Sequence, residues 1–394
     1  MFDSTICPLC RFTGCEEFLR RESVPVQQNF LTISRQKALR AKRGDLRMYF
    51  CPACGFVFNQ AFEPDLMIYD SDYNNTQESS DCFKEHLINL KNRLVHEGGL
   101  RQATIAEIGC GKGYFLKMLV LDDALGNRGF GFDPSYEGEE LLGNGRLRFE
   151  KKYFDSKCRG FSADALICRH VIEHVPDPVK FIGEISEALR DAPHCRLFFE
   201  TPCVEWIIAS LTIWDFFYEH CSLFSTGTLN RLFIQSGYKV KSIEHVFGGQ
   251  YLWLEAVKAD RQSEPTVLPA DFAEKVKKFA GYERKLISDW KSLVQKLKQQ
   301  GPLAIWGAGA KGVTFLNLFD PRCQLIDMVI DLNADKHNRY IPGTGHEVVD
   351  CRRLAESGVK NVIVMNPNYL EEIRALLAES DIRVNLIIEP GELK

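Results

Sequence analysis

Apolar and polar positions alternate along this chain in two series of short strands and helices. Between residues 80 and 260, apolar runs of strand length are separated by segments in which apolar residues recur with helical spacing. Strands that alternate with helices in this way indicate βαβ units and a parallel sheet. The runs are TIAEIGC, RGFGFD, ADALICR, CRLFFET and YLWLEAV.

A second series begins after residue 303, with the runs LAIWGAG, LIDMVID, NVIVM and RVNLII. Between the two series lie SEPTVLPADF, whose prolines are typical of a linker, and a helical pattern over 272–300 that ends at Gly301 and Pro302. We therefore expect an α/β protein with two doubly wound domains. The expected parts are a loop-rich module at 1–65, a central domain at 66–262, a linker and long helix at 263–300, and a C-terminal Rossmann-like domain at 301–394.

Size, charge and composition indicate how many domains the chain has and which partners and compartments to expect. The 394 residues exceed what one hydrophobic core usually supports. A net charge of -4 argues against a nucleic-acid partner held by bulk charge. Since no apolar run reaches the roughly 18–20 residues that span a bilayer, no membrane segment is expected. The N-terminus has no signal-peptide pattern and the 14 cysteines are mostly scattered in apolar runs, so we expect a cytoplasmic protein.

Two cysteine pairs stand out near the N-terminus. They are Cys7-Pro-Leu-Cys10 and Cys51-Pro-Ala-Cys54, and a glycine follows the second pair. Two CxxC turns can present four thiolates to one tetrahedral ion, and four thiolates leave no open position for catalysis. The sequence therefore predicts a structural zinc site, with a redox CxxC as the alternative.

The segment over 104–116 predicts a strand, a glycine turn and a helix. Its glycines let the backbone approach a ligand closely, and the N–H groups at the start of a helix can receive an anionic group. Asp133 closes the next strand, where an acidic side chain can bind ribose hydroxyls. The pattern Glu-x-Gly-x-Gly-x-Gly resembles the first motif of class I methyltransferases, which implies S-adenosylmethionine as the cofactor. A nucleotide fold with another cofactor is the alternative.

That resemblance extends along the central domain. Phe154 follows the third strand, where class I methyltransferases contact adenine, and the segment 163–174 resembles their fourth strand and the loop that faces the methyl group. The expected cofactor contacts are Glu107, Gly109, Cys110, Gly111, Gly113, Asp133, Phe154, Arg169 and His170.

Two groups of polar residues are candidates for the chemistry. His170 and His174 could bind a metal if they shared a helical face, but they straddle a strand end and a proline-bearing loop. We therefore expect His174 to line a cleft at the carboxyl edge of the sheet, with His170 in support. Tyr218, Glu219 and His220 form a polar cluster in apolar surroundings, where a histidine can act as a base and a glutamate can orient it. A purely structural role for this cluster is the alternative.

These features together resemble the sugar C-methyltransferases of deoxysugar biosynthesis. The resemblance spans nearly the whole chain: the cysteine pairs, a tyrosine-bearing segment at 69–73, the glycine loop, HVIEHVPDP and Glu219-His220. Two C-terminal motifs, at 306–312 and 331–344, complete it. The family implies an N-terminal zinc module, a central methyltransferase domain and a C-terminal Rossmann-like domain in a monomer. It also implies a nucleotide-linked 4-keto deoxysugar as substrate, bound between the central and C-terminal domains.

The second glycine loop, at 307–312, could cradle the phosphates of such a substrate at the start of a helix. A dehydrogenase would bind NAD with the same kind of loop, and Asp331 could then anchor the ribose, so this alternative stays open. The expected substrate contacts are Gly307, Gly309, Lys311, Asp331, Lys336, Arg339 and Tyr340.

The implied chemistry begins with a base that removes a proton next to the ketone, after which the enolate carbon accepts the methyl group. By matching position His220 is the base, Glu219 orients it, and His174 contacts the sugar or the enolate oxygen. Tyr218 and Tyr73 are the tyrosines expected at the sugar. The chain departs from the family twice, since Phe217 and Asn75 occupy positions where relatives carry tyrosine. Methylation at C-3 is expected, while methyl transfer to oxygen or nitrogen stays open.

Overall fold

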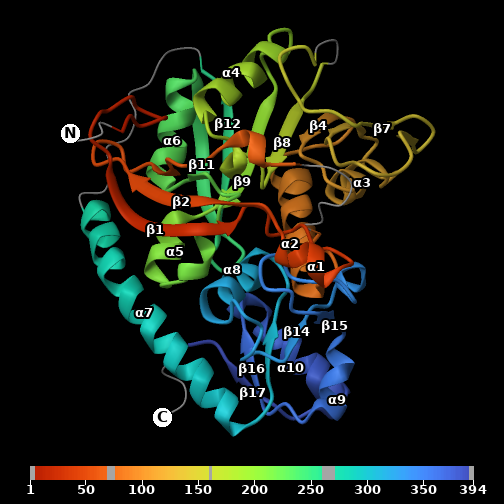
Figure 1. Ribbon diagram of the computed structural model, residues 1–394. Coiled ribbons are helices and arrows are strands. Elements are labelled where there is room, and N and C mark those ends of the chain that lie inside the picture. Colours follow the sequence, from red (N-terminus) through yellow and green to blue (C-terminus); the bar gives the residue numbers. More distant parts are fainter. Residues whose placement is uncertain (1–4, 69–75, 159–161, 260–270, 390–394) are drawn as a thin grey trace.

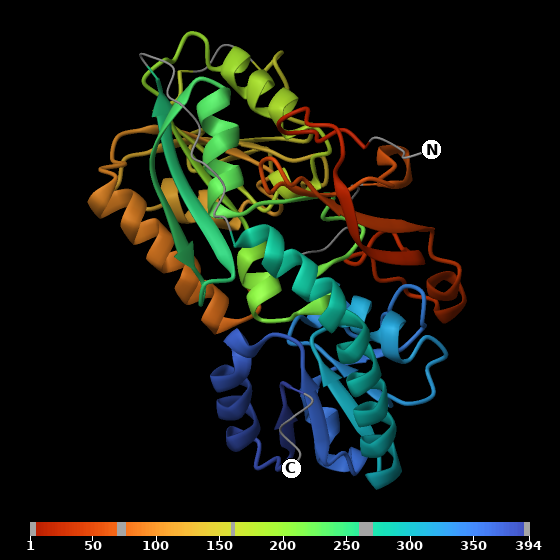
Figure 2. The ribbon, with the colours of Figure 1, turned by 90° about the vertical axis from the view of Figure 1, so that its left-hand side faces the viewer.

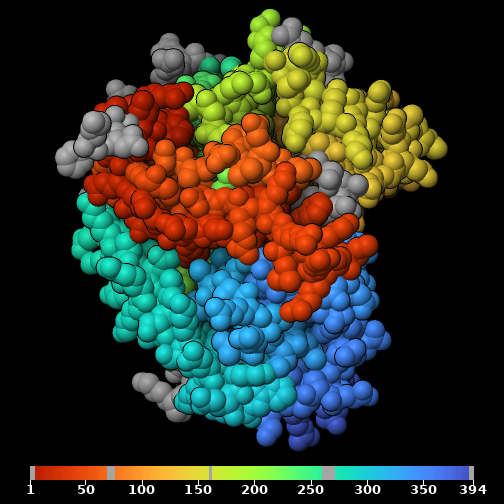
Figure 3. Space-filling model, viewed as in Figure 1, coloured from red at the N-terminus to blue at the C-terminus, as the bar shows by residue number. Residues whose placement is uncertain are grey.

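The structure is a computed structural model that describes residues 5–68, 76–158, 162–259 and 271–389. The described residues form three sheets, of four, eight and five strands. The central domain (orange to green) and the C-terminal domain (blue) lie one above the other, and the N-terminal sheet (red) crosses the front of the molecule beside them (Figures 1 and 2). Figure 3 shows that N-terminal residues cover the boundary between these two domains on this face.

The central sheet has the strand order β11-β12-β9-β8-β4-β5-β7-β6. Its core strands are parallel, which confirms the predicted doubly wound sheet. They are β4 (Thr104–Ile108), β5 (Arg128–Phe132), β7 (Leu147–Glu150), β8 (Ala165–Arg169) and β9 (Arg196–Pro202). The helices are α2 (Asp81–Asn92), α3 (Tyr114–Val120), α4 (Pro178–Ala188), α5 (Val204–Ala209) and α6 (Thr226–Gln235).

One edge of this sheet differs from the expectation of parallel strands. Strand β12 (Tyr251–Lys258) runs antiparallel to β9, and β11 (Tyr238–Val246) runs antiparallel to β12. The cause is the short connection at 247–250, because a parallel pair needs a crossover of a dozen residues or more. At the other edge, β6 (Leu141–Leu142) pairs antiparallel with β7.

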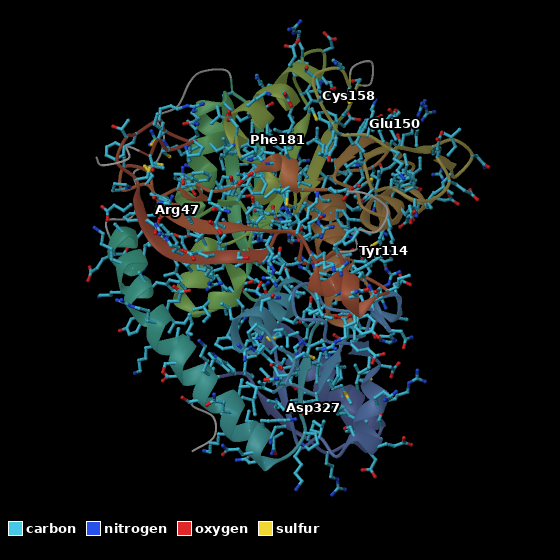
Figure 4. All side chains as sticks on the ribbon, viewed as in Figure 1. Arg47, Tyr114, Glu150, Cys158, Phe181 and Asp327 are labelled. Carbon is cyan, nitrogen blue, oxygen red and sulfur yellow. The ribbon has the colours of Figure 1, made fainter. Side chains whose placement is uncertain are left out.

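The N-terminal part contains an antiparallel sheet where the sequence predicted mainly loops. Its strands are β1 (Glu16–Pro25), β2 (Arg43–Phe50), β3 (Val57–Asn59) and β10 (Ser222–Leu223), and α1 (Arg35–Leu39) precedes β2. Strand β10 comes from the central part of the chain. Arg47, labelled in Figure 4, lies on β2, and its backbone N–H donates to Asn59 Oδ1 on β3 (2.9 Å).

The C-terminal sheet is parallel, with the order β15-β14-β13-β16-β17. The predicted helix over 272–300 is confirmed as α7 (Phe272–Gln300), which contacts β1, α5 and α8. None of the helices in the described ranges has the length and apolar character of a membrane span. The other elements are β13 (Leu303–Trp306), α8 (Ala310–Phe319), β14 (Met328–Ile330), β15 (Val348–Val349), α9 (Leu354–Ser357), β16 (Asn361–Val364), α10 (Leu370–Glu379) and β17 (Asn385–Ile387).

A buried ion pair joins three of these parts. Arg21 on β1 contacts Glu283 on α7 at 2.7 Å, and both side chains are at most 10% exposed. The same guanidinium donates to the carbonyl oxygens of Ile213 (2.7 Å) and Phe216 (2.9 Å). Arg21 therefore fixes the segment that leads into Phe217–His220.

Candidate active site

The first glycine loop follows β4 and has the form that close ligand approach requires. Gly109, Gly111 and Gly113 all have left-handed backbone angles, with φ of 66°, 52° and 75°. A Cβ on Gly109 would lie 2.2 Å from Val171 Cγ2, and one on Gly113 would lie 2.3 Å from Phe149 Cζ. A Cβ on Gly111 would have no described atom within 4 Å. Two of the glycines therefore permit packing beneath the loop, while Gly111 borders open space.

This contrast predicts different outcomes for two matched substitutions. Gly109→Ala should lower the free energy of unfolding by about 2–4 kcal/mol, because left-handed strain adds to overpacking. Gly111→Ala should cost only about 1–2 kcal/mol of strain, yet raise the Kd for S-adenosylmethionine at least about tenfold by filling the space above the loop. Urea denaturation and calorimetry measure the two effects. Equal losses of stability in both variants would contradict the contrast.

Asp133, which directly follows β5, accepts a hydrogen bond from this loop. Its Oδ2 accepts the Gly111 N–H (2.8 Å), and its Oδ1 accepts the N–H (2.7 Å) and hydroxyl (2.6 Å) of Ser135. Glu107 in β4 is buried, and burial raises its pKa to about 8. Its Oε2 has no hydrogen-bond partner among the described residues. The carboxyl group of Glu107 is therefore largely protonated at neutral pH.

The remaining expected cofactor contacts lie at or below the sheet edge. Phe154 is buried edge-on to Phe132, with ring centroids 5.1 Å apart, and Cys110 is buried within the loop. Arg169 at the end of β8 donates to Glu200 Oε2 (2.7 Å) and lies over the ring of Phe115. Arg169 is thus held in an internal ion pair.

A cleft of about 240 Å³ opens between the carboxyl edge of the central sheet and the second glycine loop. Asn29 from the N-terminal part also lines it. The cleft brings together predicted residues from sequence regions more than 80 positions apart. From the central domain these are His170, His174 and His220, joined by Glu173 and Phe217, and from the C-terminal domain Gly307, Gly309, Lys311, Asp331 and Lys336.

His174 and His220 face each other in this cleft. Their ring centroids are 4.9 Å apart at an interplanar angle of 88°, and Phe217 packs on His220 at 4.1 Å. Burial, together with electrostatic interactions with the neighbouring His174, His170 and Lys311, lowers the pKa of His220 well below its usual value. The imidazole of His220 is therefore unprotonated at neutral pH and can accept a proton.

His170 has the opposite electrostatic character. Its backbone is left-handed (φ 53°), and its ring nitrogens lie 3.4 Å from Glu173 and 3.5 Å from Glu200. Although burial opposes the charged form, Glu200 and Glu173 raise the pKa of His170 to about 9. His170 therefore carries a positive charge at neutral pH. Glu173, His174 and His220 also have ligand atoms within 4.8 Å of one another, a geometry that could hold a metal ion.

The sequence analysis did not single out Glu200, whose carboxylate contacts His170, Arg169 and His86. It is fully buried in β9 and accepts hydrogen bonds from Arg169 and from His86 Nε2 (2.6 Å) on α2. Burial opposes its charge, but the neighbouring Arg169 and His170 lower the pKa of Glu200 well below its usual value. The available signal was one acidic residue directly after the apolar run Leu-Phe-Phe of β9.

The turn at 217–220 separates the members of the predicted polar cluster. The His220 N–H donates to the Phe217 carbonyl (3.3 Å), and these two side chains face the cleft. Tyr218, expected to contact the sugar, points instead toward the N-terminal sheet. There its hydroxyl accepts the Glu63 N–H (2.8 Å) and its ring packs against Gly44.

Glu219 was expected to orient His220, and its carboxylate binds the backbone of the N-terminal part. Its Oε1 accepts the backbone N–H of Gln28 and, at 3.3 Å, that of Asn29. Glu219 therefore fixes the segment that brings Asn29 into the cleft. Tyr73 and Asn75 lie outside the described residues.

In the second glycine loop, as in the first, a backbone N–H donates to an aspartate that follows the next strand. Gly307 has φ of 118°, and a Cβ on Gly312 would lie 1.8 Å from the Gly307 oxygen. Asp331 Oδ2 accepts the Ala308 N–H (2.8 Å) and contacts Lys336 Nζ (3.2 Å). The carboxylate of Asp331 thus shapes the loop from the next strand.

Lys311 lies in the second glycine loop, at the start of α8. Its ammonium group contacts both carboxylate oxygens of Asp215 and lies over the ring of Trp206. Two expected substrate contacts lie elsewhere. Arg339 donates to the Leu31 carbonyl (3.4 Å), and the Tyr340 N–H donates to the Thr32 carbonyl (2.8 Å), so both hold the N-terminal part against the C-terminal domain.

The four predicted metal-ligand cysteines lie together, with all four sulfur atoms within 4.8 Å of one another. Cys7 and Cys54 are 3.7 Å apart, and Cys10 and Cys51 are 3.5 Å apart. Four thiolates about 2.3 Å from a tetrahedral zinc ion would be separated by about 3.7–3.8 Å. The cluster therefore has the dimensions of a site for one metal ion.

Comparison with known proteins supports a transferase. Residues 83–243 match the family model of a methyltransferase domain, and residues 255–386 match a C-methyltransferase C-terminal domain. The C-methyltransferase NovU of Streptomyces niveus is 22% identical over 349 residues, which cover 83% of this chain and 81% of NovU. A tRNA U34 carboxymethyltransferase of Campylobacter jejuni subsp. doylei is 33% identical over 100 residues, covering 23% of this chain and 33% of that protein.

Solved structures align only in part. Magnesium protoporphyrin IX methyltransferase from Synechocystis, with bound S-adenosylhomocysteine, is 18% identical with a TM-score of 0.36, over 47% of this chain and 88% of that one. CalO1, a methyltransferase in calicheamicin biosynthesis, is 18% identical with a TM-score of 0.35, over 45% of this chain and 54% of that one.

The doubly wound sheet, its glycine loop and the matched domains define the class: this chain is an S-adenosylmethionine-dependent methyltransferase. The C-terminal domain and the similarity to NovU narrow the assignment further. The chain is an S-adenosylmethionine-dependent C-methyltransferase.

Proposed function

We propose that this enzyme methylates C-3 of a nucleotide-linked 4-keto deoxysugar. The observation that carries the proposal is the cleft itself, in which the unprotonated His220 lies across from a glycine loop and two lysines of the C-terminal domain. A base and a phosphate-binding loop in one cleft suit a substrate that has both an acidic C–H and a diphosphate.

Five residues of the cleft have roles in the proposed reaction. His220 removes the proton next to the ketone, and the positive charge of His170, with His174, stabilises the oxygen on which the enolate charge develops. S-adenosylmethionine held at the first glycine loop supplies the electrophilic methyl group. Lys311 and Lys336 attract the diphosphate toward the start of α8.

Solvent exchange tests this proposal directly. Incubation with a 4-ketosugar nucleotide in D₂O should introduce deuterium at the carbon next to the ketone, and labelled S-adenosylmethionine should then transfer its methyl group to that carbon. A panel of 4-keto nucleotide sugars identifies the nucleotide and the sugar. Absence of exchange and of turnover across the panel would reject the proposal.

Methylation of oxygen or nitrogen is the second candidate, and the position of Phe217 favours it. Phe217 faces the cleft at the position where the family resemblance implies a tyrosine, and a phenyl ring offers no hydroxyl to an enolate oxygen. Methyl transfer without deuterium exchange would identify this reaction.

The opposite pKa shifts of His170 and His220 predict a broad pH profile of kcat/KM. Because the pKa of His220 is lowered, the base stays unprotonated as pH falls to 6.5, and activity should decline only below that value. Because the pKa of His170 is raised to about 9, its charge and the activity should be lost as pH rises through about 9. A profile that instead falls between pH 7.5 and 6.5 would contradict the assignment of His220.

We propose that the four cysteines hold one structural zinc ion. Cys51→Ser should reduce the bound zinc from about one equivalent to near zero, because a thiolate ligand is lost. Cys351→Ser, a substitution of a cysteine in the C-terminal domain, is the control and should retain zinc. Metal analysis of the purified proteins measures both. Full zinc retention in Cys51→Ser would reject the site.

A further inference from the structure

The cysteine cluster is connected to the cleft by a continuous antiparallel sheet. Cys51 directly follows β2 and Cys54 lies three residues before β3, so the second cysteine turn closes the β2–β3 hairpin. Within this turn the Cys51 N–H donates to the Phe56 carbonyl (2.9 Å), and the Gly55 N–H donates to the Cys51 carbonyl (2.7 Å). An ion held by the four thiolates would therefore fix the position of β3.

Strand β3 in turn holds the residues that follow His220. In β10, Ser222 pairs with Phe58 and Leu223 pairs with Val57. The Asn59 N–H donates to the Cys221 carbonyl (2.9 Å). The adjacent rings of Phe56 and Phe224 are both fully buried, with centroids 5.2 Å apart.

The residue before His220 is anchored to the same part of the molecule. Glu219 is fully buried and accepts the backbone N–H groups of Gln28 and Asn29, which follow β1. The residues directly before and after His220 are therefore both hydrogen-bonded to the cysteine-bearing module, although His220 belongs to the central part of the chain.

A further hydrogen bond extends this connection to the second histidine. The Ser222 hydroxyl donates to the carbonyl oxygen of Val175 (2.6 Å), and Val175 directly follows His174. Ser222 is fully buried. One two-residue strand thus joins the loops that carry His174 and His220, whose rings are 4.9 Å apart.

We propose that β10 is a positioning element through which the metal held by the four cysteines sets the separation of His174 and His220, with Ser222 as the positioning residue. That the distance between His174 and His220 matters for catalysis rests on the proposed function. That the metal site controls this distance does not. The alternative is that the metal stabilises only its own module.

The test uses the full-length protein with its metal, and follows the imidazole ring resonances by NMR without substrate. Removal of zinc from the wild-type protein by a chelator, verified by metal analysis, should shift or broaden the resonances of both His174 and His220. His194 is the internal reference, because its side chain is 58% exposed and forms an ordinary surface ion pair, with Asp164 at 3.6 Å. Unchanged His174 and His220 resonances in the zinc-free protein would overturn the proposal.

Ser222→Ala keeps the test decisive if zinc removal unfolds the chain. This variant should retain zinc and bind S-adenosylmethionine within about twofold of the wild-type Kd, because neither site includes the hydroxyl. Its His174 resonance should nevertheless move, and its kcat should fall about tenfold with little change in KM, since small misplacements of reacting groups are costly in rate. Ser186→Ala removes a comparable hydroxyl contact, to Tyr238 (2.8 Å), and should change none of these quantities.

The outcomes separate this proposal from the proposed function. If the resonances move as expected but no ketosugar is turned over by the wild-type enzyme, the coupling stands and the substrate assignment fails. If Ser222→Ala leaves kcat and the His174 resonance unchanged while ketosugars are methylated, the coupling fails and the function stands.

Discussion

Replacing His220 with glutamine should lower kcat about a thousandfold, within the range that general-base catalysis contributes. The imidazole of His220 is unprotonated, lies in the cleft and is packed between His174 and Phe217. Glutamine preserves much of the volume but cannot accept a proton from carbon. The Kd for S-adenosylmethionine should not change, because His220 lies in the turn before β10 and the first glycine loop lies between β4 and α3.

Two measurements distinguish this role from a general loss of structure. Deuterium exchange at the carbon next to the ketone should disappear together with methyl transfer, while the urea midpoint stays within the experimental error. His245→Gln is the matched control on the surface of β11 and should behave as the wild-type enzyme. Exchange at the wild-type rate in His220→Gln would assign the base to another residue.

Replacing Arg21 with methionine should lower the free energy of unfolding by about 3–5 kcal/mol, the cost of leaving one charge of a buried pair without its partner. Glu283 would keep its buried carboxylate, and the carbonyl oxygens of Ile213 and Phe216 would lose their donor. The double variant Arg21→Met/Glu283→Met should be more stable than the single variant, because it removes the unpaired charge as well.

Urea denaturation with a circular dichroism readout measures these differences. Arg20→Met is the matched control on the same strand, since Arg20 pairs with Glu17 while half of its side chain is exposed. Screening by water leaves such a pair with little net stabilisation, so no clear shift is expected. A double variant less stable than Arg21→Met would show that the carboxylate is not the source of the loss.

Local patterns were sufficient to predict much of the architecture and part of the cleft. The strand–glycine–helix segments at 104–116 and 303–312 form as expected, because their signals are contained in a dozen neighbouring residues. The CxxC spacing likewise predicted four adjacent thiols. His174 lies at the carboxyl edge of the sheet because it follows a parallel strand, where that edge is fixed by the topology.

Features that depend on distant contacts were not predictable in this way. The turn at 217–220 sends Tyr218 to the N-terminal sheet, and nothing in the local sequence specifies that direction. Glu200 could be noticed as an acidic residue in an apolar strand, but its partners His86 and Arg169 come from other elements. Strand β10 has two residues, too few to show any periodicity, and its partner β3 is more than 160 positions away.

The pairing of β10 with β3 also sets a limit on how this enzyme can be divided. The methyltransferase family match covers 83–243, and a fragment cut to those limits would carry β10 without the strand it pairs with. It would expose the buried rings of Phe216 and Phe224 to water. Expression of that fragment alone should therefore yield an aggregation-prone protein, and exchanging N-terminal modules between relatives should require β10 to be exchanged with them.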